Sequence, residues 1–280
     1  MVGADGLRDR LAGIGRVEDG PFDAAEAALW LSKWMDAEVE VPTYLRHLEH
    51  MVDAARAFVA DASDDADMAV DAARQMVARR FGYGPPIDTD TRATRNDLAR
   101  VMDRRRGSGA ALAAIYAHVL RALDHPPRIL DFPPRPLLAM DLRTGPAILD
   151  PGQGLRVLSI RQLRRILDDE GYPGDGLGPD RMAPLSSRGL VLRLADAIMT
   201  DHLNRGAPEA AARVLEGAVL LAPDSARAWM ELGGLLARLG RDADAVRALE
   251  RFLALPGLTE ERYTAAQMLQ RLKRNSEDTP

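Results

Sequence analysis

The sequence predicts a mostly helical α+β protein that contains one small antiparallel sheet. Apolar residues recur at helical spacing before residue 123, three short apolar runs bounded by Pro and Gly follow, and a helical pattern repeats near the C-terminus. The length of 280 residues predicts about two domains. We divide the chain into a helical N-terminal region of the core (1–90), the core itself (91–170), a linker (171–191) and a repeat region with a capping helix (192–275).

The first 123 residues predict five helices. Asp23 suits the cap of a first helix that ends at Met35, and Pro42 suits an early position in a second. A third is predicted from Ala66 to Phe81, because the glycines and prolines at 82–86 must end it. Two more follow between residues 94 and 123, separated by Gly107-Ser108-Gly109. The last of these is small and apolar, which predicts a buried helix.

The residues after Pro127 predict a sheet. Three short apolar runs bounded by Pro and Gly predict three strands, at 128–132, 137–142 and 146–150. We expect Leu112, Ile115 and Val119, which share one face of the preceding helix, to pack on this sheet. An amphipathic helix is predicted to start at Ser159, and the Gly- and Pro-rich residues at 171–187 predict a linker or long loop.

The last ninety residues contain a repeat of 34 residues. Its second copy carries most of the tetratricopeptide pattern, namely Trp229, Leu232, Gly233, Leu236, Gly240, Ala245, Leu249 and Phe252. Moving back 34 residues finds a weaker copy, and moving forward predicts a capping helix that contains Tyr263. Two repeats and a cap are too few to bury a core alone, so we expect them to dock on the preceding domain.

The composition excludes several classes of protein. The net charge of −5 argues against a general nucleic-acid binder, and the absence of cysteine excludes disulfides, thiolate metal sites and a cysteine nucleophile. No apolar leader or membrane-spanning stretch is present in the sequence, so we expect a cytoplasmic protein without membrane insertion. All but two of the 37 cationic residues are arginines, which codon bias or an arginine-built anion site would explain.

Three segments of the core resemble motifs of one known family. Gly107-Ser108-Gly109 and the small apolar helix after it resemble the nucleophile helix of transglutaminase-like proteins, where a cysteine follows a glycine and one further residue. Phe132-Pro-Pro-Arg-Pro-Leu-Leu138 is similar to the strand that carries the family histidine, and Ile148-Leu-Asp-Pro-Gly152 to the strand with the Asp-Pro motif. Together with the repeats, the chain from about Phe22 to Leu272 resembles the bacterial SirB-type family of transglutaminase-like proteins.

The resemblance implies that the catalytic residues are missing. The cysteine position falls on Gly109, the histidine position on Arg135 and the acid on Asp150. Glycine cannot attack a carbonyl, and arginine stays protonated at neutral pH. We therefore expect Arg135 to form a structural ion pair with Asp150, and we expect a pseudoenzyme that needs no cofactor and acts as a protein-binding scaffold or regulator.

Two catalytic alternatives remain open at this stage. Ser108 is adjacent to the position of the missing nucleophile, so one alternative is a hydrolase or acyl-transferase with a rearranged site around this serine. The simpler interpretation is that Ser108 caps the helix. His47 and His50 are three residues apart on one predicted helix and would share a metal if Asp53 supplied a further ligand. A polar surface is the more ordinary use of such histidines, and we predict no metal site.

The repeats predict a binding site for a protein partner. In tetratricopeptide proteins the first helix of each repeat lines a groove, and the groove positions of this chain include Arg193, Asn204, Arg227, Met230, Arg238, Met268 and Arg271. Arg227, Met230, Gly234 and Arg238 share one helix face. Because a guanidinium group can donate two hydrogen bonds to a carboxylate, we expect an acidic or C-terminal peptide segment as the partner. The alternative is a solvated arginine-rich face.

Overall fold

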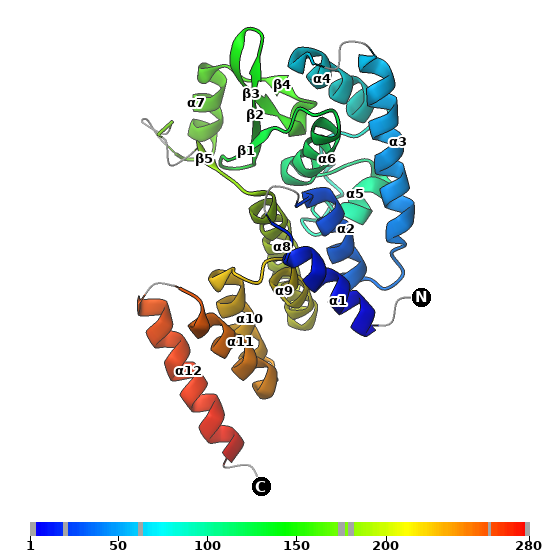
Figure 1. The fold of residues 1–280 in the computed structure, drawn as a ribbon. Coiled ribbons are helices and arrows are strands. Elements are labelled where there is room, and N and C mark those ends of the chain that lie inside the picture. Colours follow the sequence, from blue (N-terminus) through cyan, green and yellow to red (C-terminus); the bar gives the residue numbers. More distant parts are fainter. Residues whose placement is uncertain are drawn as a thin grey trace. The chain divides into compact units, whose positions relative to one another are not determined.

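The computed structural model describes residues 4–18, 22–60, 64–172, 177–178, 182–256 and 259–277 (Figure 1). The chain forms two compact units. One is Glu18–Leu194, and the other combines Met1–Val17 with Ala195–Pro280. Its architecture is mostly α with one small antiparallel sheet, as the sequence predicts.

The first helix belongs to the C-terminal unit and not to the core. Helix α1 (Ala4–Gly15) buries Leu7 and Leu11 and contacts α9 (Pro208–Leu221). At Gly15 the contact is so close that an added Cβ would lie 2.0 Å from the carbonyl oxygen of Leu220. The region 1–90 is therefore not a continuous part of the core, because the apolar face of its first helix is buried by a helix near the other end of the chain.

Five helical segments before residue 123 agree with the sequence. They are α2 (Ala24–Met35), α3 (Val41–Val59), α4 (Ala66–Ala73) with its continuation to Arg80, α5 (Leu98–Arg104) and α6 (Gly109–Ala122). The continuation of α4, Arg74–Arg80, is a π-helix, in which the Phe81 amide donates to the Met76 carbonyl at 2.9 Å. Asp23, Asp97 and Ser108 cap α2, α5 and α6 through their side chains.

The sheet has five antiparallel strands in the order β4-β3-β2-β1-β5. The three predicted strands are present as β1 (Arg128–Asp131), β2 (Leu137–Leu142) and β3 (Gly145–Asp150). Two short edge strands, β4 (Arg156–Val157) and β5 (Ala183–Pro184), extend it. Because β5 pairs with β1 and α8 (Ser187–Asn204) starts soon after, the segment 171–191 is not only a linker; residues 173–176 and 179–181 lie outside the described part.

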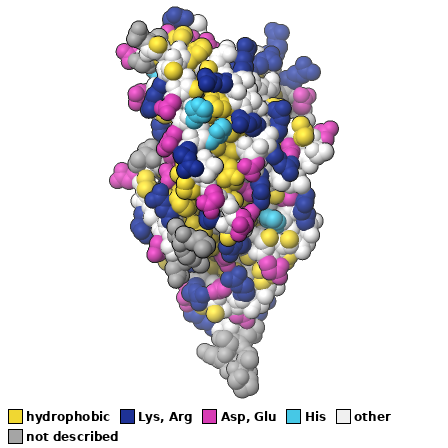
Figure 2. Space-filling model, turned by 90° about the vertical axis from the view of Figure 1, so that its right-hand side faces the viewer, with side chains coloured by type: hydrophobic (Ala, Val, Ile, Leu, Met, Phe, Trp, Pro, Cys, Tyr) yellow, Lys and Arg dark blue, Asp and Glu magenta, His cyan; other side chains and the backbone are white. Residues whose placement is uncertain are grey.

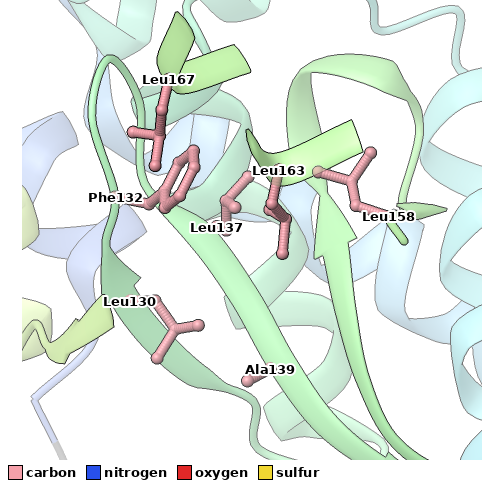
Figure 3. Packing of buried hydrophobic residues seen from close by; sticks show 7 residues of the cluster. All are labelled: Leu130, Phe132, Leu137, Ala139, Leu158, Leu163 and Leu167. Atoms are coloured by element: carbon pink, nitrogen blue, oxygen red, sulfur yellow. The ribbon is translucent and has the colours of Figure 1, made fainter. Parts of the chain in front are cut away.

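Helices cover both faces of the sheet. Helix α7 (Ile160–Asp169) and its cap at Ser159 follow the prediction, and Leu163 and Leu167 of α7 pack with Phe132, Leu137 and Ala139 (Figure 3). Residues alternate between the faces of a strand, so Leu138 and Met140 point to the opposite side, where α4 and α6 contact β2. Leu112, Ile115 and Val119 of α6 are all buried, and α6 contacts both β2 and the turn Pro151–Gln153 that follows β3.

The C-terminal unit is built from successive helical hairpins. Helices α9, α10 (Ala226–Arg238), α11 (Asp242–Ala254) and α12 (Thr259–Glu277) each contact the next helix along the chain. The first residues of α9 and α11, Pro208 and Asp242, are 34 positions apart. At Gly233 an added Cβ would lie 2.8 Å from the side chain of Leu249, so α10 and α11 approach closely there. Within the described residues, no helix combines the length and the apolar character that crossing a membrane requires.

Candidate functional site

Arg135 and Asp150 form the ion pair that the sequence predicts. Arg135 follows β1 in the loop that leads to β2, and Asp150 ends β3 and caps the following turn (Pro151–Gln153). The Nη2 atom of Arg135 donates to Oδ2 of Asp150 at 2.8 Å, and its Nε atom lies 3.3 Å from both carboxylate oxygens. Asp150 is completely buried, whereas 27% of the Arg135 side chain is exposed. The buried carboxylate of Asp150 therefore has its cationic partner within hydrogen-bonding distance.

Two further donors complete the environment of Asp150. The amide of Gly152 donates to Oδ1 at 2.9 Å, and Nε2 of Gln153 donates to Oδ2 at 3.2 Å. Arg74, in the π-helix, donates from Nε to the Gly154 carbonyl and from Nη2 to the Leu155 carbonyl. The carboxylate and the turn after it are therefore fixed by hydrogen bonds from three parts of the chain.

The side chain of Arg135 lies over Gly109, the first residue of α6. A Cβ added at Gly109 would lie 3.0 Å from Cδ of Arg135 and 3.1 Å from Cβ. Gly109 also lies beside the Asp150 turn, since a Cβ added at Gly152 would be 3.8 Å from the Gly109 Cα atom. The three positions that the resemblance selected therefore come together in space, but the space of a nucleophile side chain is filled by the stem of the arginine.

A cleft of about 340 Å³ lies at this place. Its lining residues come from five short stretches of the chain: Pro85, Pro86, Arg95, Gly107, Ser108, Gly109, Arg135, Gly152 and Gln153. Its wall combines apolar proline rings and glycine backbone with two guanidinium groups. This composition can bind a small polar molecule, whereas it supplies no thiol, imidazole or amine for covalent chemistry.

Ser108 is engaged as the cap of α6. Its Oγ atom accepts a hydrogen bond from the Ala111 amide at 3.2 Å and donates to Oδ1 of Asn96 at 2.7 Å. No described His, Asp or Glu side chain hydrogen-bonds to this hydroxyl group. Because the Asn96 amide oxygen cannot take up a proton at neutral pH, the geometry gives Ser108 no general base.

The histidines lie in other environments. Nδ1 of His118 is 2.8 Å from Oδ2 of Asp23, and the rings of His47 and His50 both pack edge-on against Phe81. Burial lowers the pKa of His47, and the charge of Arg105 adds to this effect. Among the described residues, no group of three or more His, Asp or Glu side chains could hold a metal ion. His47 and His50 thus pack on Phe81, and the described residues supply no further ligand beside them for a metal ion.

Most residues of the predicted partner groove are on the surface, and two of its arginines have acidic partners. Arg227 donates to Asp196 and to Glu231, each at 2.8 Å, and Arg193 pairs with Asp131 of β1. Asn204, Arg238 and Arg271 are exposed, and Met230 is half-buried. Neither Arg238 nor Arg271 has an ion pair recorded with a described residue. The positive charge left for a partner is therefore smaller than the sequence suggests.

The abundance of arginine is largely balanced by acidic neighbours. On the face shown in Figure 2, Lys and Arg side chains alternate with Asp and Glu. Arg100 pairs with Asp36 at 2.6 Å, and Arg241 pairs with both Glu216 and Asp244. Exposed pairs of this kind contribute little stability individually. Ion pairs thus account for part of the arginine content, and of the two cleft arginines Arg135 is paired as well, with Asp150.

Sequence reasoning missed three residues that line the cleft or hold its lining residues in place. Asn96 is buried and positions Ser108, Arg95 accepts the Ser108 amide hydrogen through its carbonyl at 2.7 Å, and Gln153 contacts Asp150. The segment 85–97 carries no motif, so its place at the rim depends on tertiary contacts. The only available signal was the glutamine that directly follows the Asp-Pro-Gly turn.

Comparisons with known proteins support the family. Two proteins of Xylella fastidiosa, both called "UPF0162 protein", from strains Temecula1 and 9a5c, are each 25% identical to this chain over 191 and 187 residues. In both cases the alignment covers 66% of this chain and 66% of the relative, so the chain spans slightly less than two thirds of the length of these relatives. No solved structure matches significantly.

A family profile covers the part of the chain that carries the cleft. The match extends over residues 42–196, from α3 to the first half of α8, and includes more than half of the chain. Gly109, Arg135 and Asp150 all lie inside it. The chain therefore belongs to the transglutaminase-like superfamily.

Proposed function

We propose that this protein is a non-catalytic member of the transglutaminase-like superfamily that acts by binding another protein. The observation that carries the proposal is the position of Arg135, whose stem lies against Gly109 while its guanidinium group binds Asp150. A thiol mechanism needs a nucleophile, a base and an acid that orients the base. Here only the acid is present, and it is already occupied by a permanent cation.

The hydrogen bonds of Ser108 support the same proposal. A serine hydrolase would need a base that accepts the hydroxyl proton, and the acceptor beside Ser108 is an amide. Its second hydrogen bond satisfies one of the free amide groups at the start of α6. The bond from Ala111 is that of a helix cap and the bond to Asn96 fixes the hydroxyl group, which together favour the structural role over the rearranged active site.

Turnover assays test the absence of catalysis. The wild-type protein should release no ammonia from glutamine amides, transfer no amine, and hydrolyse neither peptides nor esters. A fluorophosphonate should not label it, and Ser108→Ala should show the same background. Labelling that disappears in Ser108→Ala but persists in Ser159→Ala, a cap of α7, would instead establish the serine hydrolase.

We infer the partner site from the C-terminal hairpins, which we interpret as tetratricopeptide repeats. The spacing of 34 residues, the close approach at Gly233 and the hydrogen bond from Nε1 of Trp229 to the Pro223 carbonyl support that interpretation. The methyl group of Met268 in α12 would lie 3.9 Å from a Cβ added at Gly234 in α10. The first helices of neighbouring repeats are thus in contact, as a continuous groove requires.

The partner that this groove fits is an acidic peptide segment. Arg238 and Arg271, exposed on α10 and α12, have no acidic partner recorded among the described residues, whereas Arg227 is already paired with Asp196 and Glu231. Partner carboxylates should therefore interact mainly with Arg238 and Arg271. Because both side chains are exposed, the affinity should fall as the salt concentration rises.

Capture with covalent cross-linking tests the partner site. A partner captured by the wild type should cross-link to α10 or α12 and should be lost from Arg238→Glu combined with Arg271→Glu. Arg247→Glu combined with Arg251→Glu on α11, which makes the same double charge reversal in the same unit, should leave capture unchanged. Equal loss in this control, or cross-links confined to Glu18–Leu194, would contradict the proposed groove.

A further inference from the structure

We propose that the cleft beside Gly109 binds a small monocarboxylate whose negative charge faces Arg95. This inference goes beyond the proposed function, because a non-catalytic protein need not bind any small molecule. It rests on three properties of the cleft: one arginine that forms no ion pair with a described residue, one arginine whose charge is already balanced, and walls that are small and apolar.

Among the described residues, Arg95 is the cation of the cleft whose side chain forms neither an ion pair nor a hydrogen bond. Its backbone carbonyl accepts the Ser108 amide hydrogen, but its half-buried side chain has no ion pair or hydrogen bond recorded with any described residue. Asp90 is close enough for the charge of Arg95 to help lower its pKa, to which the hydrogen bond from the Ile87 amide contributes most. That carboxylate already accepts hydrogen bonds from Ile87 and, at 2.7 Å, from Arg104. A half-buried guanidinium group without its own counterion favours an anionic ligand.

Arg135 sets the charge that the ligand can carry. Its charge is balanced by Asp150, and the recorded hydrogen bonds use Nε and Nη2. The Nη1 group has no recorded acceptor among the described residues, so it can still donate to a ligand oxygen. The cleft therefore presents donors from two arginines but only one unbalanced positive charge. A carboxylate with a single charge matches this balance, whereas a doubly charged phosphate would keep one charge uncompensated.

The walls limit the remainder of the ligand. Pro85 and Pro86 form an apolar side of the cleft. At Gly107, Gly109 and Gly152 the wall of the cleft is backbone, because glycine has no side chain to project into it. The volume of about 340 Å³ is near the lower end of the range of small-molecule pockets, about 300–1,000 Å³. The ligand class is thus an acid with a short aliphatic chain, either a free acid or the C-terminal residue of a peptide.

Titration followed by amide NMR spectra of the full-length protein tests the inference. Butyrate, added at constant ionic strength, should shift the amide signals of Gly107, Gly109 and Gly152, and the uncharged analogue butanamide should not. Arg95→Gln should weaken butyrate binding about tenfold, the effect of removing one charge-assisted hydrogen bond. Arg92→Gln removes the same charge from an exposed neighbour three positions away and should bind as the wild type does.

Clear outcomes would overturn the inference. They are the absence of saturable shifts with butyrate, equal shifts with butanamide, and equal weakening in Arg92→Gln and Arg95→Gln, which would indicate only general charge attraction. A comparison of N-acetylalanine with butyrate separates the two sources, because tighter binding of N-acetylalanine indicates a peptide C-terminus and tighter binding of butyrate a free acid. None of these results depends on the turnover assays.

Discussion

Gly109 and Arg135 occupy one space, because the aliphatic part of Arg135 fills the volume into which a side chain at position 109 would project. The two contacts of 3.0 and 3.1 Å between an added Cβ and the arginine make the identities of these residues dependent on each other. A change at either position alone disturbs the other, and through it the ion pair with Asp150.

A double-mutant cycle measures this dependence. Gly109→Ala should lower the free energy of unfolding by about 1 kcal/mol, because the new Cβ crowds the Arg135 stem. In an Arg135→Gly background the crowding atoms are absent, so the same change should cost less, with a coupling of at least about 0.5 kcal/mol. Urea denaturation of the four proteins gives the coupling, and additive changes would show that the contact has no energetic effect.

Removal of the guanidinium group of Arg135 should leave the buried carboxylate of Asp150 without a cationic partner. Arg135→Met keeps the stem of the side chain but leaves the fully buried Asp150 without its cation, which should cost about 3–5 kcal/mol. Adding Asp150→Asn should recover part of this loss, because the neutral amide can still accept the hydrogen bond from the Gly152 amide. Arg156→Met, at an exposed position nearby, is the control and should change stability by less than about 0.5 kcal/mol. A double variant less stable than Arg135→Met would refute this account.

Two helix caps should give opposite pH dependences. Burial raises the pKa of Asp97, so its ionised form is disfavoured by folding and its contribution to stability falls as pH rises from about 3 to 6. Burial also acts to raise the pKa of Asp23, but the hydrogen bond and charge of His118 outweigh it and lower the pKa, so Asp23 contributes stability that is lost on acidification. Relative to wild type, Asp97→Asn should therefore gain stability with rising pH, and Asp23→Asn should lose it. Thermal unfolding across this range measures both, and parallel pH profiles would contradict the assignment.

Adjacent glycines of α10 should respond in opposite directions to the same substitution. Gly233→Ala would place a Cβ 2.8 Å from the Leu249 side chain, which should destabilise the protein by about 1–3 kcal/mol. Gly234→Ala meets only Met268 Cε at 3.9 Å and should stabilise it by about 0.5–1 kcal/mol, because alanine restricts the unfolded chain. If both variants changed the melting temperature in the same direction, the close contact between α10 and α11 at Gly233 would be contradicted.

The elements that follow from local patterns could be predicted, and those that depend on distant contacts could not. The strands around Leu138 and Leu149 were recognisable because apolar runs between Pro and Gly have few alternatives. Strand β5 has only two residues and is defined by the pairing of its backbone with β1. The pattern of side chains in the sequence does not indicate such a pairing. The Arg135–Asp150 pair was predicted from motif positions, whereas Arg95 and Asn96 reach the cleft through a segment without periodicity.

The contact between α1 and α9 has a consequence for synthesis of the chain. Helix α1 is translated before α9, and the residues of α9 that contact it, up to Leu221, follow about 200 residues later. At about 5–20 residues per second, this delay lasts about 10–40 seconds. During that time Leu7 and Leu11 lack their final neighbours, although every residue of the Glu18–Leu194 unit is made before α9 is complete. The apolar face of α1 therefore has to wait, unburied by α9, while the whole Glu18–Leu194 unit is synthesised.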